Sequence, residues 1–241
     1  MERRKSSLTT PESLVVFDVD GTLMQDNPDE ISGRAFWELN KRGIFNSSDE
    51  TLDKLQDLRN QYASCPNFER QEYLTPMIIE FDKQMRNQPV KLIEKFAAEQ
   101  AEKDIDELLY PEMAEEIELH RELGSKLGII SGSPDVFIQA IKRVLNFDLA
   151  TGTRHFHNRK EYHTVRGVRS RGKEKHGIAE KWRSNLGKEA ILSAAYGDTT
   201  NDLSLLIAAN EPVAVNPKPD LEEFSRQNDW EIIYTKERIK V

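Results

Sequence analysis

The sequence predicts an α/β protein in which a mostly parallel sheet is covered by helices on both faces. Short apolar segments alternate with segments whose apolar residues recur three and four positions apart, which is the pattern of strands alternating with helices. Polar residues follow several of the apolar segments directly, as is typical of the carboxyl ends of parallel strands. We therefore expect a functional site along one edge of the sheet.

The composition sets limits on the class of protein. The 241 residues include 37% hydrophobic and 32% charged residues, which suits a globular core with a heavily solvated surface. The net charge of -8 disfavours nucleic acid or an anionic membrane as a partner. One cysteine, Cys65, excludes an intramolecular disulfide, and no apolar run is long enough for a signal peptide or a membrane span. We expect a cytoplasmic protein and leave its oligomeric state open.

The first strand is expected at Val15, Val16 and Phe17, and it leads into Asp18 and Asp20. Residues two apart on a strand share a face, so the two carboxylates should lie close together and repel each other. Such a pair is stable when a cation lies between the carboxylates or when one of them is protonated. The pattern indicates a metal and phosphate site.

A helical segment follows the first strand. Apolar residues three and four apart, such as Leu52, Leu55 and Leu58, predict helices in most of residues 26–110. The expected helices span residues 32–41, 48–62, 68–86 and 90–102.

From Pro111 onward the pattern changes to alternating helices and strands. Pro111 suits the first turn of a helix that ends at Gly124. Ser133 is expected to cap a helix over residues 134–145, and another helix should end at Leu186. The expected strands span residues 126–131, 190–196, 212–215 and 230–234. Together these elements predict a three-layer, Rossmann-like core with an inserted helical unit.

A β-hairpin is expected over residues 151–175, around a turn at Asn158. It contains His155, His157 and His163, which could form a zinc site, although a solvated hairpin is the favoured interpretation. Its basic residues could instead bind a polyanion such as a nucleic-acid end; they are Arg154, Arg159, Lys160, Arg166, Arg169 and Arg171.

Two more predicted strands lead into polar motifs. Ser131-Gly132-Ser133 offers a hydroxyl and backbone N–H groups to an anion, although a serine beside a glycine turn is common in any loop. The other motif, residues 197–202, reads Gly-Asp-Thr-Thr-Asn-Asp and contains Asp198 and Asp202. Asp202 alone would suit the start of any helix, whereas Asp198 has no such structural explanation.

In this order, Asp-x-Asp-Gly-Thr, Ser-Gly, a lysine and Gly-Asp-x-x-Asn-Asp resemble the haloacid dehalogenase superfamily, in its phosphoserine phosphatase-like branch. The resemblance extends from Asp18 to Pro217. It implies a catalytic core over residues 8–25 and 111–241 and a mobile helical cap over residues 26–110.

The resemblance also implies roles for the acidic residues. Asp18 would be the nucleophile, forming an aspartyl-phosphate, and Asp20 would act as general acid and then general base. Mg²⁺ would be held by Asp18, the backbone carbonyl of Asp20 and Asp198. Because Asp20 is present, dehalogenation is disfavoured.

The phosphoryl group would be bound by Ser131, the Gly132 N–H, Asn201, Thr22 and a lysine. Lys175 is preferred over Lys173 because its distance from residues 197–198 in the sequence resembles the spacing in the family, and Asp202 would orient Lys175 as an ion pair.

These features predict a Mg²⁺-dependent phosphomonoester hydrolase acting on a small phosphorylated metabolite. The alternatives are phosphoryl transfer, as in a mutase, and a non-catalytic module that binds partners through the basic hairpin over residues 154–175.

The substrate stays open, because the glutamate with which phosphoserine phosphatases bind the substrate ammonium is not evident here. Asp26, Asp29 or Glu30 could replace that glutamate. Residues 68–70, which include Glu69 and Arg70, could supply a carboxylate or a guanidinium, although the solvated start of a helix is the favoured interpretation.

Overall fold

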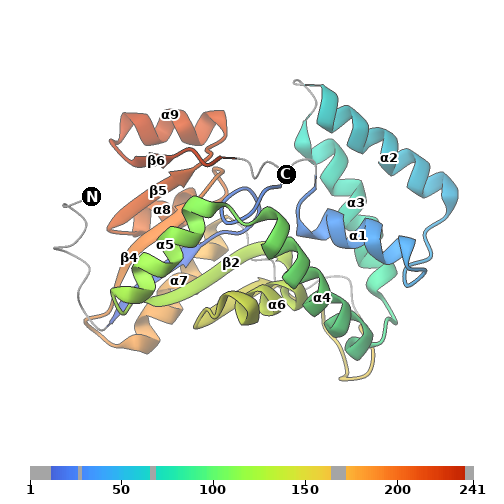
Figure 1. Ribbon diagram of the computed structural model, residues 1–241, viewed down its shortest axis with the longest axis horizontal. Helices are drawn as coiled ribbons and strands as arrows, with labels where there is room; N and C mark the ends of the chain where they lie inside the picture. Colours follow the sequence, from blue (N-terminus) through green and yellow to red (C-terminus); the bar gives the residue numbers. More distant parts are fainter. Residues whose placement is uncertain (1–11, 27–28, 66–68, 164–171, 237–241) are drawn as a thin grey trace.

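A parallel sheet forms the centre of the molecule (Figure 1). The computed structural model describes residues 12–26, 29–65, 69–163 and 172–236. Within these residues six strands lie in the order β3-β2-β1-β4-β5-β6, and every neighbouring pair is parallel. The strands are β1 (Ser13–Phe17), β2 (Lys126–Pro134), β3 (Leu149–Thr153), β4 (Ile191–Gly197), β5 (Glu211–Val215) and β6 (Glu231–Ile233). The predicted α/β fold class is confirmed.

The central strand β1 is buried on both faces. Val15 and Phe17 belong to one cluster of buried apolar side chains, whereas Leu14 and Val16 belong to another, because successive side chains of a strand point to opposite faces. A continuous apolar run is therefore what this position requires.

Helices cover both faces of the sheet and make the three layers. The cluster containing Val15 includes buried residues of α5 (Pro111–Glu122) and α6 (Asp135–Leu145), which lie in front of the sheet in Figure 1. The cluster containing Leu14 includes residues of α7 (Lys173–Leu186), α8 (Leu203–Ala208) and α9 (Pro219–Gln227). Helix α9 is not among the elements predicted from the sequence.

Four helices occupy the predicted helical insert: α1 (Ile31–Lys41), α2 (Asp49–Ser64), α3 (Arg70–Met85) and α4 (Val90–Leu108). Helices α1 to α3 stand beside the sheet, while α4 runs back toward α6 (Figure 1). Phe96 of α4 packs edge to face against Phe137 of α6, and the centroids of the two rings lie 6.0 Å apart. Apolar burial is thus continuous between insert and core, and the domain division at residues 26 and 110 stays a prediction.

Helix α4 extends six residues beyond its predicted end at residue 102. Ile105 and Leu108 continue the apolar face, and both pack against the main cluster. Asp104 is accommodated because Gln100, one turn earlier, and Arg34 both donate hydrogen bonds to its carboxylate. The sequence pattern did not predict this last part of the helix, because most of residues 102–107 are charged.

The two predicted ends of the hairpin over residues 151–175 belong to other elements, because β3 extends to Thr153 and α7 begins at Lys173. Leu149–Thr153 is β3, an edge strand that pairs with β2, and its mixed Thr and Gly composition hid it. A tight turn follows, in which the His163 N–H donates to the Phe156 carbonyl and the Asn158 N–H donates to the Glu161 carbonyl. Residues 164–171, with Arg166, Arg169 and Arg171, lie outside the described residues.

Helix α6 begins later than predicted from the sequence. Ser133 does not cap α6, because β2 continues to Pro134 and the helix begins at Asp135 with no side-chain cap. Among the described residues, no helix combines the length and apolarity that crossing a membrane requires.

Candidate active site

The site lies where β1, β2 and β4 end. Because these strands are neighbours and parallel, Asp18, Ser131 and Asp198 are brought to one edge of the sheet. They line one cavity, together with Asp20, Glu30, Gln71, Gly132, Ser133, Lys175, Thr199, Asn201 and Asp202. Most of the residues proposed from the sequence therefore gather in one place.

A buried ion cluster forms the floor of the cavity. Lys175 Nζ lies 2.6 Å from Asp18 Oδ1 and 2.5 Å from Asp202 Oδ1. Lys175 is only 3% exposed, whereas Lys173, two residues earlier in the first turn of α7, is exposed. The structure thus brings Lys175 to the site and leaves Lys173 at the surface.

The two partners of Lys175 have different surroundings. Asp202 also accepts hydrogen bonds from the Thr199 N–H and hydroxyl, so its carboxylate has several donors. Burial raises the pKa of Asp18 to about 7, although the ammonium of Lys175 opposes the shift. Further positive charge beside Asp18 would favour its carboxylate form.

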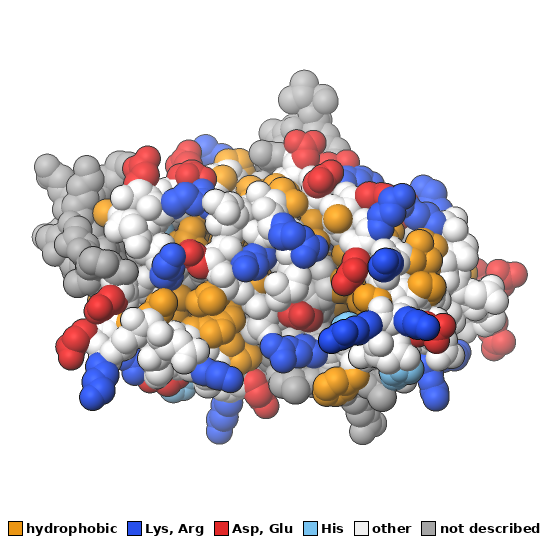
Figure 2. Space-filling model, turned by 90° about the horizontal axis from the view of Figure 1, so that it is seen from below, with side chains coloured by type: hydrophobic (Ala, Val, Ile, Leu, Met, Phe, Trp, Pro, Cys, Tyr) orange, Lys and Arg blue, Asp and Glu red, His pale blue; other side chains and the backbone are white. Residues whose placement is uncertain are grey.

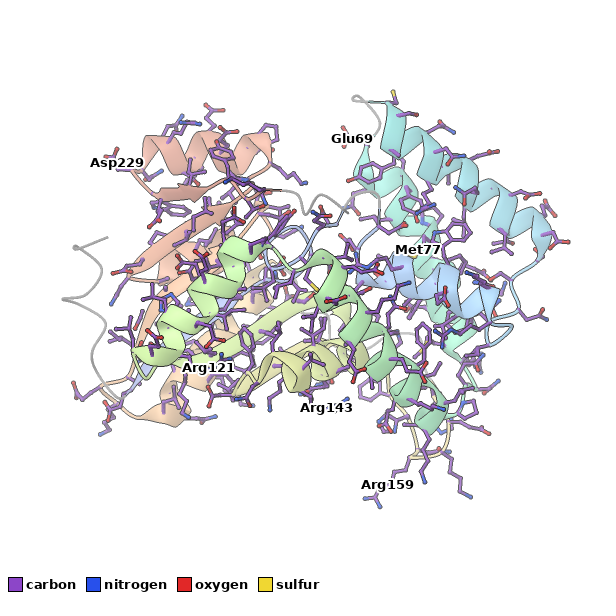
Figure 3. The ribbon with its side chains drawn as sticks, viewed as in Figure 1. Glu69, Met77, Arg121, Arg143, Arg159 and Asp229 are labelled. Carbon is purple, nitrogen blue, oxygen red and sulfur yellow. The ribbon has the colours of Figure 1, made fainter. Side chains whose placement is uncertain are left out.

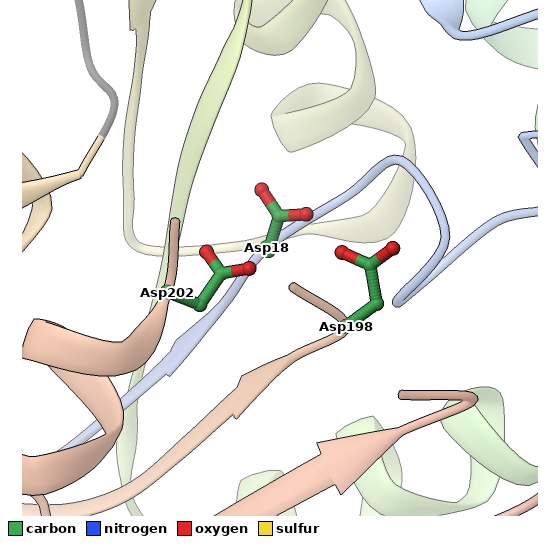
Figure 4. Close-up of side chains that lie close together, drawn as sticks. All are labelled: Asp18, Asp198 and Asp202. Atoms are coloured by element: carbon green, nitrogen blue, oxygen red, sulfur yellow. The ribbon is translucent and has the colours of Figure 1, made fainter. Parts of the chain in front are cut away.

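Three carboxylates gather at the strand ends and could hold a metal ion. Oxygen atoms of Asp18, Asp198 and Asp202 lie within 4.8 Å of one another (Figure 4). A Cβ at Gly21 would overlap Asp198 Oδ2, so only a glycine lets the loop approach this carboxylate so closely. Carboxylate oxygens are the ligands that Mg²⁺ prefers, and the residues present fit that ion. Lys175 contacts both Asp18 and Asp202, but Asp202 also accepts two hydrogen bonds from Thr199, so Asp18 and Asp198 are the better candidates for ligands.

Asp20 is held from two sides. Its Oδ1 accepts a hydrogen bond from the Ile31 N–H at 2.7 Å, and its Oδ2 accepts one from the Ser133 hydroxyl at 2.7 Å. Ile31 is the first residue of α1, so an element of the insert contacts the predicted acid and base of the core. From the sequence, Ser133 is expected to cap a helix and to belong to an anion-binding motif, and no local pattern reveals its contact with Asp20.

The expected phosphate contacts are placed unequally. Ser131, Gly132 and Asn201 line the cavity, and Ser131 Oγ already accepts the Ser133 N–H at 3.0 Å. Thr22 is fully buried and does not line it, although it was proposed to bind substrate. Its N–H donates to the Val19 carbonyl in the turn after β1, whereas its buried hydroxyl has no hydrogen-bond partner among the described residues. Its role in substrate binding stays a prediction.

The insert contributes Glu30 and Gln71 to the cavity. Of the three acidic residues considered for substrate recognition, Asp29 is engaged elsewhere, since Tyr73 and Arg59 both donate to its carboxylate. Asp26 lies near Lys218, 4.0 Å from its ammonium. Glu30 is therefore the acidic candidate from the insert that reaches the cavity.

The structure does not support the possibility that Glu69 or Arg70 contacts substrate in the cavity. Glu69 is exposed at the start of α3 and does not line the cavity (Figure 3). The side chain of Arg70 and all of Phe68 lie outside the described part of the chain. Gln71 belongs to no motif that could have revealed it in the sequence.

The three histidines do not gather into a metal site. His155 Nε2 lies 2.7 Å from Asp82 Oδ1 in α3, and the His157 ring packs against Tyr162. Asp18, Asp198 and Asp202 are the group of three metal-type ligands found among the described residues. The tip of the turn, marked by Arg159 in Figure 3, points away from the molecule.

A family model agrees with this arrangement. It is described as haloacid dehalogenase-like hydrolase, and it matches residues 15–206, from the first strand to α8. The chain belongs to this family. The match covers every predicted site residue, so the order of motifs and the geometry of the strand ends lead to one family of hydrolases.

Two curated relatives match most of this chain. Protein CicA of Caulobacter vibrioides is 29% identical over 200 residues, covering 82% of this chain and 83% of its own. A histidinol-phosphatase of Neisseria meningitidis serogroup C is 22% identical over 230 residues, covering 92% of this chain and 98% of its own.

Solved structures share the fold. A Bordetella pertussis protein of unknown function superimposes with a TM-score of 0.73 at 21% identity, covering 93% of this chain and 99% of that one. A phosphoserine phosphatase described as a phospho-aspartyl intermediate analogue superimposes with a TM-score of 0.58 at 23% identity, covering 93% of each chain. This chain therefore shares its fold with a phosphoserine phosphatase.

Proposed function

We propose that this haloacid dehalogenase-like hydrolase is a Mg²⁺-dependent phosphatase that cleaves small phosphomonoesters through an aspartyl-phosphate on Asp18. The observation that carries the proposal is the buried arrangement of Lys175 between Asp18 and Asp202, with Asp198 beside them. An ammonium and a nucleophilic carboxylate at one strand end provide what phosphoryl transfer needs, which is positioning and offset of negative charge. The similar phosphoserine phosphatase, captured as an analogue of a phospho-aspartyl intermediate, supports the same chemistry for Asp18.

In the first step a carboxylate oxygen of Asp18 bonds to phosphorus as the bond to the leaving oxygen breaks. The electron pair of the broken bond stays on the leaving oxygen, which takes a proton from the carboxyl group of Asp20. Lys175 and the N–H of Gly132 would oppose the negative charge on the phosphoryl oxygens.

In the second step water attacks the phosphorus of the aspartyl-phosphate. Asp20, now ionised, accepts a proton of that water. The bond between phosphorus and the Asp18 oxygen breaks, and its electron pair returns to the carboxylate of Asp18. Phosphate then leaves, and Asp20 carries the proton needed for the next cycle.

Asp18, Asp198 and the backbone carbonyl of Asp20 would hold Mg²⁺, which when bound offsets the charge of the phosphate beside the carboxylates. Ile31 and Ser133 both donate hydrogen bonds to the side chain of Asp20. The side chain can therefore transfer a proton while the backbone carbonyl of the same residue binds the ion.

The proposed substrate is a small phosphomonoester that carries a cationic group. Glu30 supports this, because it brings a carboxylate from the insert to the same cavity as Asp18. The histidinol-phosphatase and phosphoserine phosphatase to which the chain is similar are named for phosphomonoesters that contain an amine. These likenesses indicate an amine-bearing class rather than one metabolite.

The central experiment is hydrolysis of p-nitrophenyl phosphate with and without Mg²⁺. We expect phosphate release that requires Mg²⁺ and that Asp18→Asn abolishes, because an amide cannot act as the nucleophile. Activity retained in Asp18→Asn, or absent from the wild type under all metal conditions, would contradict the proposal. Phosphate moved to an added alcohol would indicate a transferase instead.

Substrate class is tested with pairs of alkyl phosphates that differ only in an amine. Glu30→Gln should raise KM for the amine-bearing member about tenfold or more and leave the amine-free member little changed, because only the former loses a charge pair. The matched control is Glu69→Gln, since Glu69 is exposed outside the cavity. Equal effects of Glu30→Gln on both members would contradict the assignment.

A further inference from the structure

We propose that Ser133 is a positioning residue that orients the carboxyl group of Asp20 for proton transfer, an inference that rests on the proposed phosphatase function. The Ser133 hydroxyl donates to Asp20 Oδ2 at 2.7 Å, across 113 residues of sequence. Both side chains are buried, Ser133 to 1% exposure and Asp20 to 8%. Both also line the candidate active-site cavity.

Ser133 is itself held in place. It lies near the end of β2, and its N–H donates to the hydroxyl of Ser131 at 3.0 Å. Its own hydroxyl does not cap α6, because that helix begins at Asp135 and has no side-chain cap. The bond to Asp20 is therefore the contact that the structure records for this hydroxyl, and local helix structure does not explain it.

The two donors to Asp20 act on different oxygens. The Ile31 N–H holds Oδ1 from the start of α1, and Ser133 holds Oδ2 from the end of β2. The terminal torsion of an aspartate is soft, so a single donor leaves the plane of the carboxyl group free to rotate. Two donors define the plane, and each oxygen keeps a lone pair that can carry the transferred proton.

The more the leaving oxygen needs a proton, the more the rate should depend on the orientation of the Asp20 carboxyl group. As the phosphorus–oxygen bond breaks and the bond to Asp18 forms, the leaving oxygen keeps the electron pair and takes the proton of Asp20. A nitrophenolate leaves readily without that proton, whereas an alkoxide does not. A misoriented Asp20 should therefore slow alkyl phosphates more than activated aryl phosphates.

The test compares wild type and Ser133→Ala on p-nitrophenyl, phenyl and benzyl phosphate, in saturating Mg²⁺. The three probes are similar in size but differ in how well the alcohol leaves, and kcat/KM reports the steps through departure of that alcohol. We expect Ser133→Ala to lower kcat/KM about tenfold or more for benzyl phosphate and less than about threefold for p-nitrophenyl phosphate, since general acid catalysis contributes roughly 10²–10⁴-fold.

Two further variants separate positioning from structural damage. Asn201→Ala removes a proposed phosphate contact and should lower kcat/KM by the same factor for all three probes. In an Asp20→Asn background, Ser133→Ala should add no further dependence on the leaving group, because no carboxyl proton remains to be positioned.

The outcomes are distinguishable. A Ser133→Ala variant whose loss is equal across the three probes, or which loses nothing, overturns the positioning role while leaving the phosphatase proposal intact. A wild-type protein that hydrolyses none of the probes overturns the phosphatase proposal itself.

Discussion

Charge balance at single residues sets the chemistry of the site. Lys175 is buried, and its ammonium is flanked by Asp18 and Asp202. The charge of Lys175 stabilises both carboxylates in a region from which water is largely excluded. Burial lowers the pKa of an ammonium, yet the two carboxylates outweigh it and hold the pKa of Lys175 above its ordinary value. Lys175 thus stays charged throughout the physiological range.

Replacing Lys175 should cost both activity and stability. We expect Lys175→Met to lower kcat on p-nitrophenyl phosphate by about 10²-fold or more. The free energy of unfolding should fall by about 3 kcal/mol, because two buried carboxylates lose their partner. Lys173→Met is the matched control; it removes an exposed lysine and should change stability by less than about 0.5 kcal/mol. The reverse ranking of the two variants would assign the site lysine to Lys173.

Asp148 gives a pH-dependent prediction at the residue scale. Partial burial opposes its ionisation, but hydrogen bonds from Lys126 and the Leu127 N–H outweigh burial and hold the pKa of Asp148 below its ordinary value. A carboxyl whose pKa is lower in the folded state stabilises the protein above its unfolded-state pKa of about 4. That stability is lost as the pH falls through the lower, folded-state pKa.

We therefore expect Asp148→Asn to destabilise the protein by about 0.5–1 kcal/mol at pH 7, a small figure because the pair is partly exposed and solvent screens it. Urea unfolding across pH measures the difference, which should shrink below pH of about 4. A difference that is unchanged at acid pH would show that charge is not its source.

At the scale of elements, a polar network ties the helices of the insert together. The Tyr73 hydroxyl of α3 donates to Asp29 Oδ1 at 2.5 Å and accepts from Trp37 Nε1 of α1 at 3.1 Å. Arg59 of α2 donates to the other oxygen of Asp29. Asp29 directly precedes Glu30, which lines the cavity, and Ile31, whose N–H donates to Asp20. The network therefore supports the segment that joins the insert to the site.

Tyr73→Phe should destabilise the protein by about 1–3 kcal/mol, because Asp29 and the Trp37 N–H each lose a buried partner. Thermal or urea unfolding measures the change. Tyr234→Phe is the matched control, since that hydroxyl also makes hydrogen bonds, to Glu222 and Arg226, but at the surface. Similar losses in the two variants would show that burial of the network contributes little.

At the scale of the whole molecule, ion binding should be linked to folding. A ligand that binds only the folded state stabilises it in proportion to the logarithm of its concentration. The proposed ligands come from the ends of β1 and β4, so Mg²⁺ would bridge two central strands. Acidic and basic side chains are interspersed over the face of the molecule that Figure 2 shows.

We expect Mg²⁺ to raise the thermal midpoint of the wild type progressively and a chelator to lower it and to abolish activity. Asp198→Asn should lose the Mg²⁺-dependent rise, because one charged ligand is replaced by an amide. Glu211→Gln, at the start of β5 and away from the site, should keep the rise. A rise of the same size in Asp198→Asn would place the ion elsewhere.

By itself the sequence determined the parallel sheet, the helical insert, the order of the motifs and the carboxylates at the strand ends. These follow from local periodicity and from the rule that parallel strands end at one edge of a sheet. The family resemblance already favours Lys175 over Lys173, and the structure places Lys175 against Asp18. Only the tertiary structure decided that Ser133 holds Asp20 instead of capping α6, and that Glu30 rather than Asp29 lines the cavity. The physical reason is that a hydrogen bond or an ion pair depends on distances of a few ångströms between segments far apart in the chain, which no local pattern records.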